Sequence, residues 1–359
     1  MNKMMKKAIA LLMAAAMTVG VAACGNSNDK PAETTEATTE ASAEAGAENS
    51  EEPAAADPTA EAAADNADDG EFIVGYIAKN TVDAFHATIN NAAKESLDKL
   101  VADGAITKWN LYDGLTDPVT QNNLLEDAIN MGADLIILLP AEAAGCAPIV
   151  ERCKDLNIPI IVVNSKTDNT DELATAYVGS DDVQAGEMMA NFVAEQLPNG
   201  GGYGHLQGII GNSAQIDRGT GIHNVMDGNE KWALLDGAEQ TAEWQAEKAV
   251  KFAEDWLTKY GDKLNAVICD NDDMSSAVQT AMNAAGRNDI VCIGVDGNVG
   301  PMTMVQNGEL LATVYQDGAG QVTTAINMIP QIRKGEEVAK ETMVDFVLVT
   351  KDNVDQYLK

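Results

Sequence analysis

The sequence predicts an α/β protein whose parallel sheets are covered by helices on both faces. Short apolar runs of strand length recur along residues 72–349, and amphipathic stretches of helical length separate most of them. A strand that is apolar throughout is buried on both faces, which is typical of parallel sheets. Because about ten strands exceed what one doubly wound sheet holds comfortably, we expect two doubly wound, Rossmann-like lobes.

Composition narrows the function before any motif is considered. The chain has 359 residues, with 56 acidic and 23 basic side chains and a formal net charge of −33. A protein this acidic, with no basic stripe, has nothing with which to displace counterions from nucleic acid, so that partner is excluded. The three histidines are scattered along the sequence and the five cysteines form no C-x-x-C pair. We therefore expect no metal and no cofactor.

The first 24 residues are predicted to be a lipoprotein signal peptide. Three lysines within residues 3–7 precede an uncharged apolar run over 8–23. That run, at about 16 residues, is short for a membrane span, which needs about 20. Small residues end it directly before Cys24, an arrangement that resembles the lipobox of bacterial lipoproteins, in which the Cys24 thiol would carry a diacylglycerol. An ordinary secretory signal with an incidental cysteine is the alternative, and both lead out of the cytoplasm.

Residues 25–70 form a low-complexity segment rich in alanine, threonine and acidic residues. The segment contains no aromatic residue and no aliphatic side chain larger than alanine, so it cannot bury enough apolar surface to fold. Like charges keep such a chain extended. We expect a disordered acidic tether between Cys24 and a globular region that starts at residue 71.

Strands and helices alternate in the globular region. The first apolar run, 72–78, is followed by a helical stretch over 84–100. The other predicted strands are 135–139, 158–163, 176–179, 205–210, 266–269, 291–295, 311–315 and 344–349. The other predicted helices are 120–131, 183–197, 247–260, 274–285 and 321–333. The glycine-rich segments 200–204 and 294–300 lack the position or spacing of a phosphate loop and are predicted to be turns.

Polar side chains follow most of the predicted strands, at the edge where α/β sheets bind ligands. A sugar offers hydroxyls that donate and accept hydrogen bonds, together with a weakly apolar C–H face. Carboxylates, amides and a guanidinium pair with the hydroxyls, and aromatic rings cover the C–H face. The residues that supply this set are Asp83, Phe85, Asn164, Arg218, Trp244, Asn271, Asp296 and Gln316. His86 is also included in the predicted site. An equally good alternative is that it lies at the rim of the cleft with its hydrogen bonds made within the protein.

The order of these segments resembles the type I substrate-binding proteins of bacterial ABC importers, in the branch that serves ribose, galactose and glucose. The resemblance covers nearly all of 72–350. It rests on six segments in sequence order: Asp83-Ala-Phe85, Leu206 to Gly219, Thr241 to Trp244, Ala266 to Met274, Gly294 to Gly297, and Leu311 to Gln316. It implies that the polar residues contact sugar hydroxyls, that Phe85 and Trp244 cover the two ring faces, and that a galactose- or glucose-like hexose is favoured over ribose.

The resemblance also implies an architecture and a partner. Three chain crossings, near residues 180, 316–317 and 345–346, would form a hinge. The N-terminal lobe would comprise 71–180 plus 317–345, and the C-terminal lobe 181–316 plus 346–359. Closure of the lobes around the ligand would present a closed form to the permease of an ABC importer. We expect a monomer without enzymatic activity, either held on the outer face of the cell membrane through Cys24 or located in the periplasm.

Departures from the family leave the sugar open. Asn212 and Ala214 stand where hexose binders carry histidine and aspartate, and the calcium loop of some relatives has no counterpart before Tyr203. Lys79 occupies a position that usually carries an uncharged residue in relatives. Its side chain is expected either in solvent or in the cleft, with equal weight. A receptor that reports to a chemotaxis or signalling partner fits the same sequence. A secreted α/β hydrolase is less consistent with it, because no G-x-S-x-G elbow is present.

Several of the chosen residues also have a purely structural alternative. Asp296 would serve as a helix cap, Phe85 and Trp244 as core residues, and Arg218 as the ion-pair partner of Asp217 or of another surface acid. One residue within 271–273 is expected to cap a helix that starts near residue 274. The cysteines at 146, 153, 269 and 292 are predicted to be buried thiols, and a bond between the last two stays open.

Overall fold

The computed structural model describes residues 70–358 of the chain. The predicted signal peptide, the lipidation site Cys24 and the tether over 25–70 lie outside these residues, except for Gly70. Within the described part, no helix has both the length and the apolar character that a membrane crossing requires. The expected α/β fold with parallel sheets is confirmed, and it is organised around three sheets, A, B and C.

Sheet A has six strands, all parallel, in the order β12-β5-β4-β3-β1-β2. The strands are β1 (Ile73–Ala78), β2 (Lys108–Asp113), β3 (Leu135–Leu138), β4 (Ile160–Asn164), β5 (Ala176–Gly179) and β12 (Glu341–Met343). Every residue of β1, β3, β4 and β5 is buried, which is why these strands are continuous apolar runs in the sequence.

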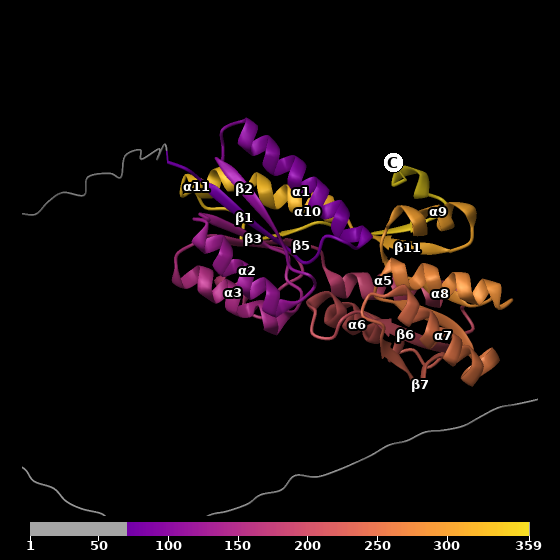
Figure 1. The fold of residues 1–359 in the computed structure, drawn as a ribbon. Coiled ribbons are helices and arrows are strands. Elements are labelled where there is room, and N and C mark those ends of the chain that lie inside the picture. The colour runs from indigo at the N-terminus through magenta and orange to yellow at the C-terminus, as the bar shows by residue number, and fades with distance from the viewer. Residues whose placement is uncertain (1–69, 359) are drawn as a thin grey trace, which may run out of the picture. The chain divides into compact units, whose positions relative to one another are not determined.

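Helices cover both faces of sheet A (Figure 1). One face carries α1 (Ala84–Ala102), α10 (Gly318–Asn327) and α11 (Ile329–Arg333). The other carries α2 (Pro118–Asn130) and α3 (Ala143–Asp155), with the short α4 (Thr170–Leu173) beside them. The single helix predicted over 321–333 is two helices, and the break coincides with Pro330 in the first turn of α11.

Sheets B and C follow each other in the chain, except that β13 of sheet C comes after β12 of sheet A. Sheet B is parallel, in the order β7-β6-β8-β9, and sheet C has the order β10-β11-β13. Their strands are β6 (Gly201–Gln207), β7 (Trp232–Thr241), β8 (Leu264–Cys269), β9 (Val291–Ile293), β10 (Val295–Asp296), β11 (Ala312–Tyr315) and β13 (Val347–Thr350). Strand β13 is antiparallel to β11, so sheet C departs from the parallel arrangement that the sequence predicts.

Two apolar clusters hold helices against sheets B and C. One contains α5 (Asp182–Gln196) and α6 (Ser213–Met226). The other contains α7 (Ala246–Tyr260), α8 (Asp272–Ala284) and α9 (Val299–Asn307), and short 3-10 turns at Gly261–Lys263 and Val354–Gln356 complete the elements. The cysteines at 146, 153, 269 and 292 are buried free thiols.

The prediction of a turn over 200–204 is wrong, because Gly201–Gly204 form the first half of β6. The glycines are needed there for packing instead of for a turn. A Cβ on Gly204 would lie 2.4 Å from the ring of Trp256, and one on Gly202 would lie 2.3 Å from the carbonyl oxygen of Lys263. Helix α7 at Gly204, and the 3-10 turn that follows α7 at Gly202, therefore approach β6 more closely than a side chain on these residues would allow.

Candidate functional site

A cavity of about 340 Å³ is lined by residues that follow strands of all three sheets. The carboxyl ends of parallel strands are where α/β folds bind ligands. The structure brings all nine of the ligand-binding residues predicted from the sequence into this cavity: Asp83, Phe85, His86, Asn164, Arg218, Trp244, Asn271, Asp296 and Gln316.

Asp83 and His86 form a closed hydrogen-bonded unit at the start of α1. Asp83 caps the helix by accepting from the backbone N–H of His86 at 2.7 Å, and it also accepts from Nδ1 of His86 at 2.9 Å and from Nδ2 of Asn80 at 2.6 Å. Burial alone would raise the pKa of Asp83, but the hydrogen bonds from His86 and Asn80 hold it well below its usual range.

The ring of His86 is neutral near pH 7. Burial lowers its pKa and outweighs the opposite effect of Asp83. Because Nδ1–H donates to Asp83, Nε2 carries the lone pair and is an acceptor. That Nε2 atom is buried without a partner, so His86 is able to accept a hydrogen bond from a ligand hydroxyl.

Arg218, on α6, is 4% exposed and held in place on three sides. Its Nε donates to Oδ1 of Asp182 at 2.8 Å, Nη1 to the carbonyl oxygen of Asp270 at 2.5 Å, and Nη2 to Oε1 of Gln316 at 3.2 Å. Its ion-pair partner is therefore Asp182, not Asp217. A guanidinium has five N–H donors, so two stay available for a ligand.

Three buried polar atoms on the cavity lining have no hydrogen-bond partner: Nε1 of Trp244, Nε2 of Gln316 and Nε2 of His86. One further such atom, Oη of Tyr203, occurs among the described residues. A buried polar atom without a partner costs about 1–3 kcal/mol, and such atoms are rare in folded proteins. A polar ligand in the cavity would complete the hydrogen bonding of these three atoms.

Aromatic rings border the cavity on two elements. Phe85 lies in the first turn of α1, and Trp244 follows β7. The indole lies against Gly208, where a Cβ would come within 2.3 Å of three ring atoms. Nζ of Lys79 lies 5.1 Å from the centroid of the indole, within the range of a cation–π contact.

Lys79 belongs to the cavity instead of the solvent, the alternative that the sequence left open. It follows β1, is 5% exposed and lines the cavity. Burial lowers its pKa to about 8, against the opposite influence of Asp83 and Asp296. Among the described residues, no carboxylate lies within ion-pair distance of its ammonium group, so its donors face the cavity without a fixed acceptor.

Asn164 and Asn271 each use part of their amide to hold the protein and leave the rest for a ligand. Nδ2 of Asn164 donates to Oε1 of Gln321 at 2.9 Å. Oδ1 of Asn271 accepts from the backbone N–H of Met274 at 3.2 Å and caps α8, as one residue within 271–273 was expected to do. Oδ1 of Asn164 and Nδ2 of Asn271 are the side-chain atoms left for a ligand.

Asp296 is buried at the end of β10, with a φ of 140°. Burial and the neighbouring Asp272 raise the pKa of Asp296 well above its usual range, which favours the neutral acid. Asn298 occupies the N-cap position of α9, so Asp296 is not the helix cap that its position before glycine also allowed. Asp273 also lines the cavity, and burial raises its pKa.

Backbone strain is concentrated at this cavity. Seven non-glycine residues of the described part have a positive φ. Five of the seven line the cavity: Thr116, Asn164, Glu243, Trp244 and Asp296. Such conformations cost of order 1–3 kcal/mol each and persist where the surrounding structure enforces them, often at binding sites.

The cavity also contains polar residues that were not predicted to bind a ligand, including Asn80, Thr116, Ser165, Glu243 and Gln245. Four of these residues lie in or next to the polar segments that follow predicted strands, and this position could have identified them as cavity residues: Asn80, Ser165, Glu243 and Gln245. Thr116 follows β2, a strand that was not predicted, and nothing in its local sequence singles it out.

The chain is similar to known extracytoplasmic solute-binding proteins. Residues 74–337 match the family model of the periplasmic binding protein domain. A xylitol-binding protein of Mycolicibacterium smegmatis is 31% identical over 73% of this chain and 74% of its own length. A ribose import binding protein of Bacillus subtilis is 29% identical over 74% of this chain and 85% of its own.

Solved structures give the same result. An ABC transporter solute-binding protein from Bacillus halodurans, with bound myo-inositol, is 29% identical with a TM-score of 0.76, over 82% of this chain and 99% of that chain. The matched proteins are solute-binding proteins and not enzymes. These findings confirm the predicted fold and the predicted resemblance to the sugar-binding proteins of ABC transporters.

Proposed function

We propose that this chain, which belongs to the periplasmic binding protein family that serves sugar ABC transporters, captures a neutral six-carbon ring polyol and delivers it to an importer. The observation that carries the proposal is the set of unpartnered polar atoms on Trp244, Gln316 and His86 around a single cavity bordered by two aromatic rings. Hydroxyls that both donate and accept match these atoms.

The charges around the cavity favour a neutral ligand. Arg218 is ion-paired with Asp182, and the buried ammonium of Lys79 is attracted by the carboxylate of Asp83 in the same lining, so these charges offset one another without a charged ligand. The raised pKa of Asp296 reduces its negative charge further. A ligand with a full charge would have to disturb these pairs, at the cost of a buried unpaired group.

The size of the cavity and the relatives guide the choice of polyol. A volume of about 340 Å³ lies at the low end of small-molecule sites, which span about 300–1,000 Å³. The galactose- or glucose-like hexose predicted from the sequence stays a candidate. Relatives are named for xylitol and ribose, and one solved neighbour holds myo-inositol, so cyclitols belong in the same set.

Such a ligand is large enough for useful affinity. Micromolar binding corresponds to about −8 kcal/mol. A six-carbon polyol has about 12 non-hydrogen atoms, so the requirement is about −0.7 kcal/mol per atom, well within the bound for small ligands.

We further propose that the chain divides into the two lobes inferred from the sequence, 71–180 plus 317–345 and 181–316 plus 346–359. The segment that follows β3 of sheet A contacts the segment that follows β6 of sheet B beside the cavity. The backbone N–H of Ala143 donates to the carbonyl oxygen of Gly211, and Nδ2 of Asn212 donates to the carbonyl oxygen of Ala141. A ligand held by both sides would stabilise this closed form, which a permease would recognise. In this proposal the protein is a monomer, tethered to the membrane through Cys24.

Titration calorimetry of the full chain tests the proposal. The panel contains hexoses, pentoses, inositols and, as charged counterparts, a uronate and an amino sugar. We expect one neutral ring polyol to bind with one-to-one stoichiometry and to be recovered chemically unchanged. Trp244→Ala should weaken binding about 10- to 100-fold, the loss of about 1.5–3 kcal/mol of aromatic contact.

The matched control for this variant is Trp109→Phe, because Trp109 lies on β2 and its Nε1 donates to Asp98 away from the cavity. It should bind like the natural protein. A folded chain that binds none of the panel, or that prefers the charged members, would end the assignment.

A further inference from the structure

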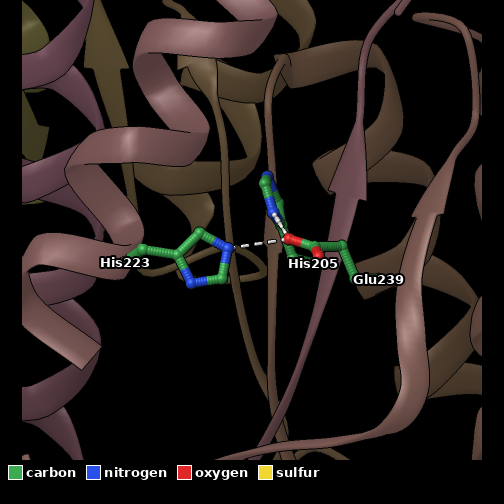
Figure 2. A group of neighbouring side chains, drawn as sticks. All are labelled: His205, His223 and Glu239. Atoms are coloured by element: carbon green, nitrogen blue, oxygen red, sulfur yellow. Dashed lines mark hydrogen bonds and ion pairs between the residues drawn. The ribbon is translucent and has the colours of Figure 1, made fainter. Parts of the chain in front are cut away.

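A second polar cluster lies outside the ligand cavity, on β6, α6 and β7. Figure 2 shows its three members, His205, His223 and Glu239, with both imidazole rings directed at the same carboxylate. Nδ1 of His205 lies 3.1 Å and Nε2 of His223 2.9 Å from Oε1 of Glu239. One donor atom from each residue lies within 4.8 Å of the others.

We propose that this cluster is a binding site for a divalent transition-metal ion, with Zn²⁺ as the expected occupant, held by Nδ1 of His205, Nε2 of His223 and the carboxylate of Glu239. Two imidazoles and one carboxylate are a ligand set that zinc uses in proteins, usually with water in the fourth position. Tetrahedral ligands about 2.0 Å from zinc lie about 3.3 Å apart, so the two separations from Glu239 need to open only slightly, and the two histidine nitrogens lie within 4.8 Å of each other.

The outer nitrogen of each histidine is already oriented by a carboxylate. Nε2 of His205 lies 2.8 Å from Oδ1 of the fully buried Asp270, and Nδ1 of His223 lies 3.2 Å from Oδ1 of Asp227. A carboxylate behind each ligating histidine is the arrangement that fixes the tautomer and ring orientation in zinc sites. Both histidines have such a carboxylate at the outer ring nitrogen. The nitrogens next to Glu239 are therefore the ones available to bind the metal.

The fold makes the cluster rigid on one side and accessible on the other. In the pairing of β6 with β7, His205 stands directly opposite Glu239. The His205 side chain is fully buried, whereas those of His223 and Glu239 are 33% and 32% exposed. An ion is therefore able to enter from solvent and meet a preformed edge of the site.

Burial and the neighbouring carboxylates act on the pKa values of the two histidines in opposite directions. Burial alone would lower the pKa of His205, but Asp270 and Glu239 outweigh it and raise the pKa to about 9. Glu239 and Asp227 also raise the pKa of His223, against burial. Because a ligating imidazole nitrogen must be unprotonated, zinc competes with protons for both histidines.

The site would connect the metal to the framework of the ligand cavity. Asp270, which orients His205, also accepts from the backbone N–H of Gly208 and, through its carbonyl oxygen, from Arg218. Helix α6 carries both His223 and Arg218. A metal bound here would brace the elements that position the guanidinium without touching the ligand, so the proposal does not depend on which polyol binds.

The test measures zinc bound to the full chain after chelator treatment, exposure to zinc alone and desalting. We expect one tightly bound zinc per chain and a higher melting temperature with zinc. Glu239→Gln and the partly exposed His223→Gln should each lose that zinc and its thermal effect. Asp227→Asn should lower zinc affinity about tenfold, the low end for a group behind a ligand.

Glu230→Gln is the matched control, because Glu230 is exposed on the segment between α6 and β7. It should bind zinc like the natural chain. X-ray absorption at the zinc edge should show two imidazole ligands. Equal zinc content in the natural chain and in Glu239→Gln and His223→Gln, or none in any of them, would overturn the proposal, whatever the outcome of the sugar titrations.

Discussion

The buried ion pair between Asp182 and Arg218 gives the sharpest prediction about how the cavity is built. Asp182 does not line the cavity, but its Oδ1 accepts from Nε of Arg218 at 2.8 Å, and each side chain is only 5% exposed. Asp182→Asn keeps the shape and one hydrogen-bond acceptor but removes the charge that compensates the guanidinium. The variant therefore tests whether a residue outside the cavity holds Arg218 in position.

The expected magnitude follows from the burial of the pair. Leaving a buried ion without its partner costs about 3–5 kcal/mol, because the remaining charge is uncompensated. The amide oxygen of asparagine still accepts one hydrogen bond, worth about 1 kcal/mol. We expect Asp182→Asn to lower the free energy of unfolding by about 2–4 kcal/mol. For a chain of this size the melting temperature should fall by about 4–8 °C.

Thermal and urea unfolding check the stability, and titration calorimetry checks the affinity, which should fall about tenfold or more as Arg218 loses its fixed position. Asp181→Asn is the matched control, because Asp181 is the exposed N-cap of α5 and asparagine caps as well as aspartate. It should change stability by less than about 0.5 kcal/mol. Equal behaviour of Asp182→Asn and Asp181→Asn in both assays would refute the assigned role.

Three further predictions concern the cavity and the histidine cluster. Because burial lowers the pKa of Lys79 to about 8, ligand affinity should fall about fivefold from pH 7 to 9.5 as roughly 1 kcal/mol of charge-assisted hydrogen bonding is lost, and calorimetry of Lys79→Met should show a flat profile. Gly208→Ala should weaken ligand binding about tenfold or more, because its Cβ would displace the Trp244 ring, whereas Gly228→Ala, whose Cβ meets open space, should bind normally. The pKa of His205 is about 9 when folded against 6.5 when unfolded, so its stabilisation is complete below pH 6.5 and disappears as the pH rises through 9. With a chelator present, urea unfolding should show a loss of stability on the order of 3 kcal/mol over this pH range. An equally large loss in Glu239→Gln would contradict the role of Glu239 in raising the pKa of His205.

The strands of the cores were predictable, and three edge strands, β2, β7 and the largely exposed β12, were not. Strands buried on both faces are continuous apolar runs, so β1, β3, β4 and β5 are evident in the sequence. Strand β2 is half exposed along its length, and β7 mixes buried and exposed residues around Gly237. Each forms the edge of its sheet, where burial on one side only leaves no apolar run to recognise.

The site residues were predictable because each follows a strand, and the fold gathers strand ends. Asp182 was missed because it is one of two consecutive acids at the start of a helix, where helix capping accounts for the presence of both. Its ion-pair partner, Arg218, lies 36 residues away in the sequence. The three members of the histidine cluster were missed for a similar reason. The distance between His205 and Glu239 depends on the register of β6 and β7, and β7 was not predicted.

The most direct test of the proposed function is a crystal structure of the full chain grown with the tightest-binding member of the polyol panel. We expect one ring between Phe85 and Trp244, within hydrogen-bond distance of the guanidinium of Arg218. The unpartnered nitrogen atoms of Trp244, Gln316 and His86 should then contact the hydroxyls. Electron density for the polyol at any other place, with this cavity holding only solvent, would contradict the proposal.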